Sequence, residues 1–328
     1  MSAPLAVVGA GAWGTALANA AAIAGEDVLL WGRDPDHIAA MARDRENARH
    51  FPGVPLEGRV RVTSALMDLS ACDAALLVTP AQSAREMTEA LALVLATDAP
   101  LVICAKGIER ATGFFLSDVV ADLRPGAPVA ALSGPSFADD VARGLPTAVT
   151  LACPDGARAA ALAARLSGRT FRVYHSSDLR GVEIGGAAKN VLAIACGAAI
   201  GRGLGESAKA ALTARGFSEL MRFARAFGGR PETLMGLSGL GDVVLTCGSA
   251  QSRNFAFGER LGRGASVFEA AGGRLVEGVF TAQALVSMAG ARGIEMPIAA
   301  AVEALVSGRI DLDAALEQLM TRPLKAED

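Results

Sequence analysis

Short apolar runs alternate with longer segments of helical pattern through the first half of the chain. Runs rich in leucine, valine and alanine predict buried strands, which are expected at residues 5–8, 28–31, 75–78, 101–105, 129–132 and 148–152, with 171–174 as a further candidate. Helical patterns separate several of them, at 36–45, 83–95 and 155–166. This alternation is typical of an α/β fold in which helices cover a doubly wound, mainly parallel sheet.

The pattern changes after residue 176, because strand-like runs almost disappear. Long alanine-rich helical stretches are expected at 179–200 and 207–227, and shorter ones continue to Met320. With 328 residues, the chain also exceeds the size at which one hydrophobic core usually stops growing. We therefore expect two domains, an α/β domain over 1–176 and an all-α domain over 177–328.

Nothing in the overall charge indicates nucleic acid or an anionic membrane as a partner. The chain has 31 basic and 34 acidic residues and a net charge of -3, so an anionic substrate would need a local site. The five cysteines form no CxxC pair, which favours reduced thiols and a cytoplasmic location. The three histidines are too dispersed to suggest a metal centre, so no metal is expected.

No membrane insertion is expected either, although two stretches are strongly apolar. The segment from Met1 to Gly25 lacks the basic leader of a signal peptide and contains spaced glycines. The segment from Ile184 to Gly201 holds Lys189 within it. Both are interpreted as buried parts of a soluble protein.

A glycine-rich turn, Gly9-Ala10-Gly11-Ala12-Trp13-Gly14, follows the first predicted strand and opens a predicted helix. Such a turn lets the backbone approach a pyrophosphate, and the free amides and dipole of the helix neutralise its charge. The motif alone arises often by chance in a glycine-rich chain. Its position between a strand and a helix favours dinucleotide binding over a plain tight turn.

Two opposite charges follow the second predicted strand, where the adenosine ribose should lie. Asp34 could accept a hydrogen bond from a 2′-hydroxyl, whereas Arg33 could pair with a 2′-phosphate and stack on adenine. Arg33 therefore predicts that NADP is accepted, with NAD left open. The alternative is that Arg33 is an ordinary solvated loop residue.

Lys189 is the one charge near the middle of a long apolar helical stretch. Because desolvation lowers the pKa of a lysine, it could accept or return the proton of an alcohol. Gly185 and Gly186 lie on the same helical face, so we expect open space for a substrate beside the ammonium group. The alternative is a snorkelling or structurally paired lysine.

Two further clusters have side chains suited to an anionic substrate. The stretch 238–242 ends in Asp242, which could orient Lys189 or a substrate hydroxyl, and 251–254 contains Arg253, which could grip phosphate oxygens. Lys106 and the segment 133–136 follow predicted strands, so they should converge on the nicotinamide and substrate. Each cluster could instead consist of cap, loop or turn residues.

Seven motifs, in order, resemble those of bacterial NAD(P)-dependent glycerol-3-phosphate dehydrogenases, and the resemblance extends over essentially the whole chain. They lie at residues 9–18, 105–109, 132–137, 185–190, 239–242, 251–254 and 276–278. The resemblance implies a Rossmann-like domain followed by an all-helical domain. It also implies that dihydroxyacetone phosphate and glycerol 3-phosphate are the substrates, that the product feeds phospholipid synthesis, and that NADP or NAD is the cofactor.

The resemblance implies roles for individual residues. Lys189, with Asp242 beside it, matches the proton-transfer position. Positions expected to hold glycerol 3-phosphate are Lys106, Gly134, Ser136, Lys189, Asp242, Ser252, Arg253 and Asn254. Positions expected to contact the dinucleotide are Gly9, Gly11, Ala12, Trp13, Gly14, Arg33, His50, Lys106, Ala138, Arg253, Leu275 and Glu277. Ala12 stands where many relatives have a hydroxyl residue, and His50 replaces a commoner aromatic residue.

Two other functions remain open at this point. A related dehydrogenase could act on a hydroxyacid instead of a phosphate ester, and a nicotinamide-sensing regulatory protein could keep the fold without catalysis. The combination of Lys189, Asp242 and Arg253 argues against the second. A homodimer is one assembly that the sequence leaves open.

Overall fold

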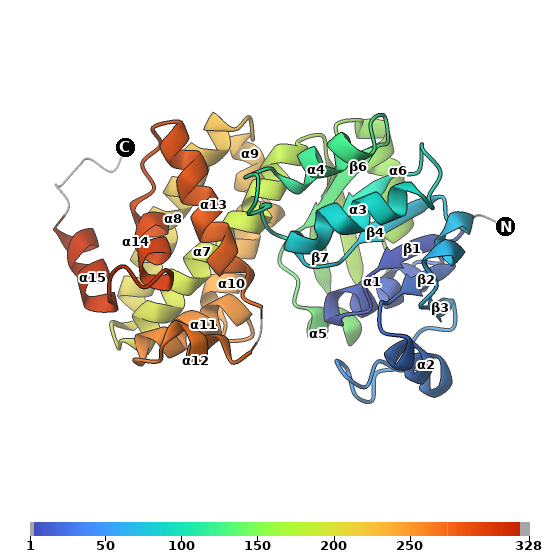
Figure 1. Cartoon of the computed structure of the whole chain (residues 1–328), viewed down its shortest axis with the longest axis horizontal. Coiled ribbons are helices and arrows are strands. Elements are labelled where there is room, and N and C mark those ends of the chain that lie inside the picture. The colour runs from blue at the N-terminus through green and yellow to red at the C-terminus, as the bar shows by residue number, and fades with distance from the viewer. Residues whose placement is uncertain (1–2, 274, 322–328) are drawn as a thin grey trace.

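The computed structural model describes residues 3–273 and 275–321 (Figure 1). Its first half contains an eight-stranded sheet in the order β3-β2-β1-β4-β5-β6-β7-β8. The strands are β1 (Leu5–Val8), β2 (Val28–Trp31), β3 (Val60–Thr63), β4 (Ala74–Leu77), β5 (Leu101–Ile103), β6 (Val129–Ser133), β7 (Thr147–Ala152) and β8 (Phe171–Ser176). The predicted strands are confirmed, with ends shifted by up to two residues.

One strand was missed by the sequence pattern. β3 lies at the edge of the sheet and pairs with β2, with Arg61 exposed on it. Because an edge strand is buried along only part of its length, the four-residue run has no continuous apolar pattern to identify it.

Neighbouring strands are parallel except at one place, where β7 runs antiparallel to β6. The chain order reverses between β1 and β4, which are neighbours in the sheet. At such a switch point the carboxyl ends of the strands open a crevice for a ligand. Because β7 returns antiparallel, the connection after Ser133 stays at this same edge.

Helices cover both faces of the sheet. They are α1 (Ala12–Ile23), α2 (Pro35–Asp44), α3 (Ala84–Ala92), α4 (Leu116–Leu123), α5 (Ala138–Ala142) and α6 (Gly156–Leu166), with short 3₁₀ turns η1 (Leu66–Ala71) and η2 (Ala81–Ser83). Leu5 and Val7 pack with the core beneath α1, α2 and α6, whereas Ala6 and Val8 pack with α3 and α4. Side chains that alternate between two buried faces explain the continuous apolar runs of the strands. The fold is Rossmann-like.

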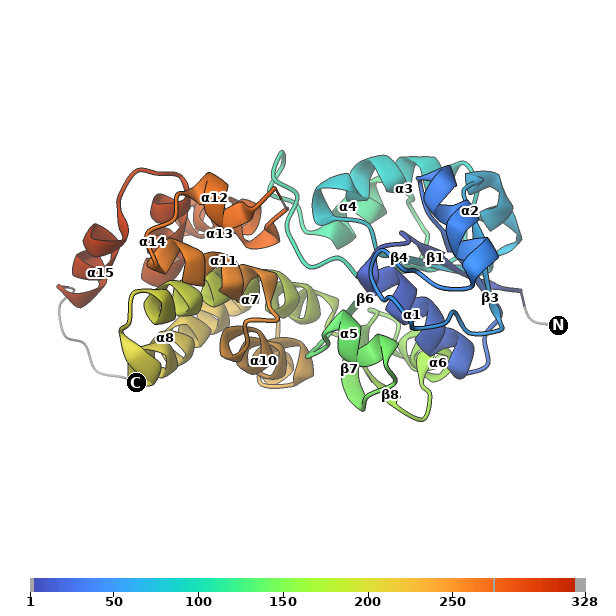
Figure 2. The same ribbon diagram turned by 90° about the horizontal axis from the view of Figure 1, so that it is seen from below.

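The second half of the chain is helical. Its elements are α7 (Leu179–Gly201), α8 (Gly205–Ala226), α9 (Pro231–Leu234), the π-helix η3 (Leu237–Gly241), α10 (Asp242–Gly248), α11 (Arg253–Gly262), α12 (Val267–Ala271), α13 (Glu277–Ala291), α14 (Pro297–Val306) and α15 (Leu312–Met320). α7 runs through the middle of this half, in contact with α8, α10, α11, α13 and α14 (Figure 2).

Glycines bring α7 and α11 unusually close together. A Cβ atom on Gly197 would lie 2.1 Å from the carbonyl oxygen of Phe255, and one on Gly258 would lie 2.1 Å from that of Ile194. Because no larger residue fits at these points, the small residues of both helices set the position of α11 against α7. The first residues of α11 are thereby placed beside the middle of α7.

α7 is long and apolar enough to cross a membrane, and the bent pair 231–248 and 253–262 passes the same test. Within its apolar window, 83% of α7 is buried inside the protein. Core helices of soluble proteins have the same length and composition, and burial accounts for the apolar character of α7 as the sequence predicted.

Candidate active site

The glycine-rich turn lies at the switch point of the sheet. Gly9 has a φ of +122°, and a Cβ atom there would lie 3.1 Å from the carbonyl oxygen of Val78. A Cβ atom on Gly14 would lie 1.8 Å from the carbonyl oxygen of Gly9, whereas nothing lies within 4 Å of one on Gly11. No side chain caps the start of α1. The turn therefore presents open backbone at a free helix N-terminus, which fits a dinucleotide pyrophosphate.

Polar atoms around this turn have unused hydrogen-bonding capacity. Trp13 Nε1, Asn47 Oδ1 and Thr79 Oγ1 are buried without a partner in the described part of the chain. The Asn47 amide donates to the carbonyl oxygen of Ala10 at 3.1 Å and to Thr15 Oγ1 at 2.7 Å. Asn47 thus supports the turn, a role that no sequence pattern indicated. Buried polar atoms without partners favour a ligand at this edge.

The two charges after β2 have different environments. Asp34 caps α2 by accepting from the His37 amide at 3.1 Å, and it pairs with Arg49 at 3.2 Å. The His37 amide and Arg49 hold the Asp34 pKa below its usual range. Arg33 is exposed and has no bonded partner among residues 3–273 and 275–321. Since Asp34 caps α2, Arg33 is the side chain free to contact a 2′-phosphate. His50 is exposed, and its ring lies near that of His37 at the start of α2.

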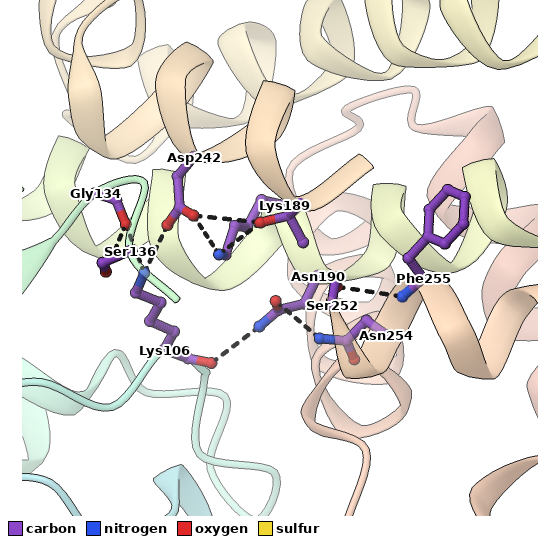
Figure 3. Close-up of polar contacts among 10 residues, drawn as sticks. Lys106, Gly134, Ser136, Lys189, Asn190, Asp242, Ser252, Asn254 and Phe255 are labelled. Carbon is purple, nitrogen blue, oxygen red and sulfur yellow. Dashed lines mark hydrogen bonds and ion pairs between the residues drawn. The ribbon is translucent and has the colours of Figure 1, made fainter. Parts of the chain in front are cut away.

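Lys189, Asp242 and Lys106 meet where the two halves of the chain face each other (Figure 3). Lys189 Nζ donates to Asp242 Oδ1 and, at 2.8 Å, to Thr246 Oγ1. Lys106 Nζ donates to Asp242 Oδ2 at 2.7 Å. The carboxylate lies between two ammonium groups, one on α7 and one after β5. The structure brings these three predicted residues together and adds Thr246. The one signal for Thr246 in the sequence is its position four residues after Asp242, which places both on the same face of α10.

Burial determines the chemistry of Lys189. Its side chain is 9% exposed and that of Asp242 is 1% exposed. Desolvation lowers the Lys189 pKa to about 8, with Asp242 opposing this change and the Lys106 charge adding to it. The predicted direction is confirmed. Lys189 is paired but does not snorkel, so pairing and a pKa near neutrality occur together.

The expected open space beside Lys189 is not formed by Gly185 and Gly186. A Cβ atom on Gly185 would lie 2.3 Å from the carbonyl oxygen of Ser238, and one on Gly186 would lie 2.6 Å from Ser133 Oγ. That prediction was wrong, because the glycines serve close packing of α7 against η3 and β6. Helical spacing identifies a shared face but not what lies opposite it.

The loop after β6 lies against Lys106. Lys106 Nζ donates to the carbonyl oxygen of Gly134 at 3.0 Å, and Ser136 Oγ donates to the same oxygen at 3.1 Å. Gly134 has a φ of +151°, and a Cβ atom there would lie 2.8 Å from Val149 Cα. Only glycine fits this turn, which explains how the loop folds back toward Lys106. Lys106 and the segment 133–136 therefore meet at the sheet edge, and their contact with the nicotinamide and substrate stays a prediction.

The start of α11 lies beside the middle of α7. Ser252 caps α11 by accepting from the Phe255 amide at 3.3 Å, as the alternative interpretation of this residue held. Asn254 Nδ2 donates to Asn190 Oδ1 at 2.9 Å, and Asn190 Nδ2 donates to the carbonyl oxygen of Lys106 at 3.3 Å. Asn190 was not among the predicted site residues. It links Asn254, a candidate for binding the anionic substrate, to Lys106.

The remaining predicted cofactor residues differ in burial and bonding. Glu277 Oε1 accepts from the Ala81 amide at 3.3 Å, and Oε2 is buried without a hydrogen-bond partner in the described residues. Burial raises the Glu277 pKa, and the Arg253 charge acts against that rise. Arg253 is exposed and Leu275 is 40% exposed, while Ala138 begins α5 and is half-buried.

A large open space lies away from the predicted site residues, and the described residues offer no metal site. A cavity of about 480 Å³ lies between β8, α9 and η3, but it contains none of the predicted substrate or cofactor residues. Across residues 3–273 and 275–321, no group of three or more His, Cys, Asp or Glu side chains could hold a metal ion. The candidate active site is therefore the cluster of Lys189, Asp242 and Lys106.

Comparison with known proteins agrees with this geometry. The family models for the N-terminus and C-terminus of NAD-dependent glycerol-3-phosphate dehydrogenase match residues 4–159 and 178–317. Two similar relatives are both named glycerol-3-phosphate dehydrogenase [NAD(P)+]. The relative from Methylobacterium radiotolerans is 64% identical and covers 99% of this chain and 98% of its own length. The relative from Azorhizobium caulinodans is 63% identical, with coverages of 98% and 97%.

Among solved structures, glycerol-3-phosphate dehydrogenase from Coxiella burnetii superimposes with a TM-score of 0.93 at 38% identity. The match covers 98% of this chain and 99% of that chain. The arrangement of both halves of the chain is thus shared with that structure. The chain belongs to the NAD-dependent glycerol-3-phosphate dehydrogenase family.

Proposed function

We propose that the protein catalyses reversible hydride transfer between NAD(P)H and dihydroxyacetone phosphate, which gives sn-glycerol 3-phosphate. The observation that carries this proposal is the buried Lys189, whose pKa of about 8 lets it hold or release a proton near neutral pH. The names of relatives that match the whole chain support the same reaction. When bound, the nicotinamide supplies the hydride for reduction and accepts it for oxidation.

Lys189 handles the proton of the substrate oxygen in this scheme. Its ammonium form gives a proton to the carbonyl oxygen while C2 receives the hydride, and its neutral form takes a proton from the alcohol in the reverse direction. Asp242 and Thr246 fix the direction of Nζ, and Lys106 adds positive charge next to the developing alkoxide. Orientation of these groups supplies much of the catalysis.

The substrate phosphate is assigned to the start of α11. Its free amides and dipole favour an anion, and Arg253 and Asn254 add side-chain donors. Ser252 contributes chiefly by capping the helix. The complete proposed substrate set is Lys106, Gly134, Ser136, Lys189, Asp242, Ser252, Arg253 and Asn254.

The dinucleotide is assigned to the switch point of the sheet. The proposed set is Gly9, Gly11, Ala12, Trp13, Gly14, Arg33, His50, Lys106, Ala138, Arg253, Leu275 and Glu277. The unpartnered Trp13 Nε1 and Glu277 Oε2 support this assignment. We place the boundary between the cofactor domain and the helical substrate domain at residues 176 and 177, between β8 and α7.

We further propose that the enzyme works in the cytoplasm and that its product supports phospholipid synthesis. All five cysteines are buried and free, in keeping with a reducing compartment. A homodimer is the assembly proposed for test by sedimentation.

Absorbance of the reduced nicotinamide tests the reaction directly. Purified protein should oxidise NADPH or NADH when dihydroxyacetone phosphate is added, and should reduce the oxidised cofactor with glycerol 3-phosphate. Turnover of small hydroxyacids, with dihydroxyacetone phosphate neither reacting nor inhibiting, would establish the hydroxyacid alternative. Tight NADH binding without oxidation by any metabolite would favour a nicotinamide sensor.

A further inference from the structure

α7 carries a second set of polar residues before Lys189. Arg180 and Glu183 lie in its first two turns, and Lys189 follows Glu183 by six residues, a rise of about 9 Å along the helix. Among the described residues, neither Arg180 nor Glu183 forms a hydrogen bond or ion pair with Lys189 or Lys106. Both face α4, which belongs to the cofactor domain.

The Glu183 carboxylate is buried against the start of α4. Its side chain is 6% exposed. Glu183 Oε1 accepts from the Ser117 amide at 2.8 Å, and Ser117 Oγ donates to Oε2 at 2.5 Å. Arg180 lies 3.5 Å from Oε2. A carboxylate from one domain therefore binds both donors of a single residue in the other.

Arg180 holds the same segment from the other side. It pairs with Asp118 at 2.7 Å, and its guanidinium lies 4.0 Å from the ring centroid of Phe115. Phe115 also meets Phe227 edge to face, with centroids 5.9 Å apart. The first turn of α4 is thus held by charge, hydrogen bonds and aromatic packing from the helical domain. We call residues 115–118 with Arg180 and Glu183 the α4 clasp.

The clasp is connected to the reacting groups by a short segment of chain. Lys106 stands after β5, and the loop from Lys106 leads to Phe115 at the start of α4. One end of this loop contacts α7 through Asn190 and Gly186, and the other end contacts it through Glu183. α7 therefore contacts this part of the cofactor domain at two points, one beside Lys106 and one at Glu183.

Burial of Glu183 is costly, which argues for a specific role. Desolvation raises its pKa to about 7, although Arg180 and the two Ser117 bonds lower it and Asp118 adds to the rise. Lys106 lines the same small cavity as Glu183. An apolar residue would fill the position without this penalty.

We propose that Glu183 is a positioning residue for the hydride-transfer reaction, which holds Lys189 in register with the cofactor domain through its bonds to Ser117. Because Glu183 lies outside the proposed substrate and cofactor sets, we expect its loss to act on the placement of Lys189. A displacement of about 1 Å at a reacting group can cost about a hundredfold in rate. The inference rests on the proposed function.

The test compares Glu183→Ala and Glu183→Gln with Glu219→Ala. Glu219 is a matched control because it is also buried, at 2% exposure, and it accepts from the Ile298 and Ala299 amides at 2.8 and 3.2 Å within the helical domain. We would measure kcat for dihydroxyacetone phosphate reduction against pH, the Kd of NADPH by fluorescence, and the thermal midpoint. Rates are expressed per folded protein.

We expect Glu183→Ala to lower kcat at least about tenfold while the NADPH Kd changes less than about twofold. A displaced Lys189 would be more hydrated, which raises its pKa. The alkaline limb of the profile of kcat against pH should therefore move to higher pH. Glu183→Gln should recover part of the rate, because its oxygen still accepts from the Ser117 amide. Glu219→Ala should keep kcat within about twofold and leave the limb in place.

Equal kcat in Glu183→Ala and Glu219→Ala, or an unmoved alkaline limb, would overturn the proposal. If Glu183→Ala does not fold, Ser117→Ala decides, because it removes the Oγ donor to Glu183 Oε2; wild-type kcat and an unmoved alkaline limb in that variant would also overturn the proposal. Lack of turnover by the wild type would instead contradict the proposed function, so the two failures are distinguishable.

Discussion

Replacing Lys189 with alanine tests the mechanism most directly. The protein should fold, because Asp242 keeps its bond to Lys106 at 2.7 Å and no unpaired carboxylate remains in the core. Thr246 Oγ1 lies 3.3 Å from Asp242 Oδ1 and can donate to it in place of Lys189. The residues proposed to bind NADPH do not include Lys189. Binding of NADPH should therefore stay within about threefold of wild type.

Turnover should fall much further. Removal of a general acid typically costs about a hundredfold or more, equivalent to about 2.7 kcal/mol in the activation barrier. Initial rates of NADPH oxidation at saturating dihydroxyacetone phosphate measure kcat, and fluorescence titration measures NADPH binding. Lys189→Met is a control that keeps most of the side-chain volume. A kcat within about threefold of wild type, in a folded variant that binds NADPH, would remove Lys189 from the proton-transfer role.

Three further predictions follow from the same geometry. Reduction requires the ammonium form of Lys189, so kcat for reduction should be level below about pH 8 and fall above it. The kcat for oxidation should rise with pH through the same region. Identical pH profiles in the two directions would contradict the assignment. Arg33→Ala should lower the ratio of kcat/KM for NADPH to that for NADH, because the exposed guanidinium is the candidate partner of the 2′-phosphate; an unchanged ratio would leave Arg33 without this role. Gly258→Ala should reduce the free energy of unfolding by about 1–3 kcal/mol and raise the KM for dihydroxyacetone phosphate. The reason is that the added Cβ would meet the carbonyl oxygen of Ile194 and push α11 away from α7. Thermal unfolding measures the first effect and initial rates measure the second.

Local patterns in the sequence were enough for the architecture. Strands buried on both faces have continuous apolar runs, and the glycine turn stands between the first strand and the first helix. The same approach failed at β3, where an edge position removes the apolar signal. Sequence patterns did identify Lys189, because an isolated charge in an apolar helix is unusual.

Tertiary structure alone decided how distant residues combine. Asp242 meets Lys106 from 136 positions away, and the two glycines before Lys189 contact η3 and β6 instead of leaving space for a substrate. Glu183 appears in the sequence as one more acidic residue, and its bond to Ser117 depends on where α4 packs against α7. Periodicity reports which face of a helix a residue occupies, but the group opposite that face depends on the packing of the whole chain.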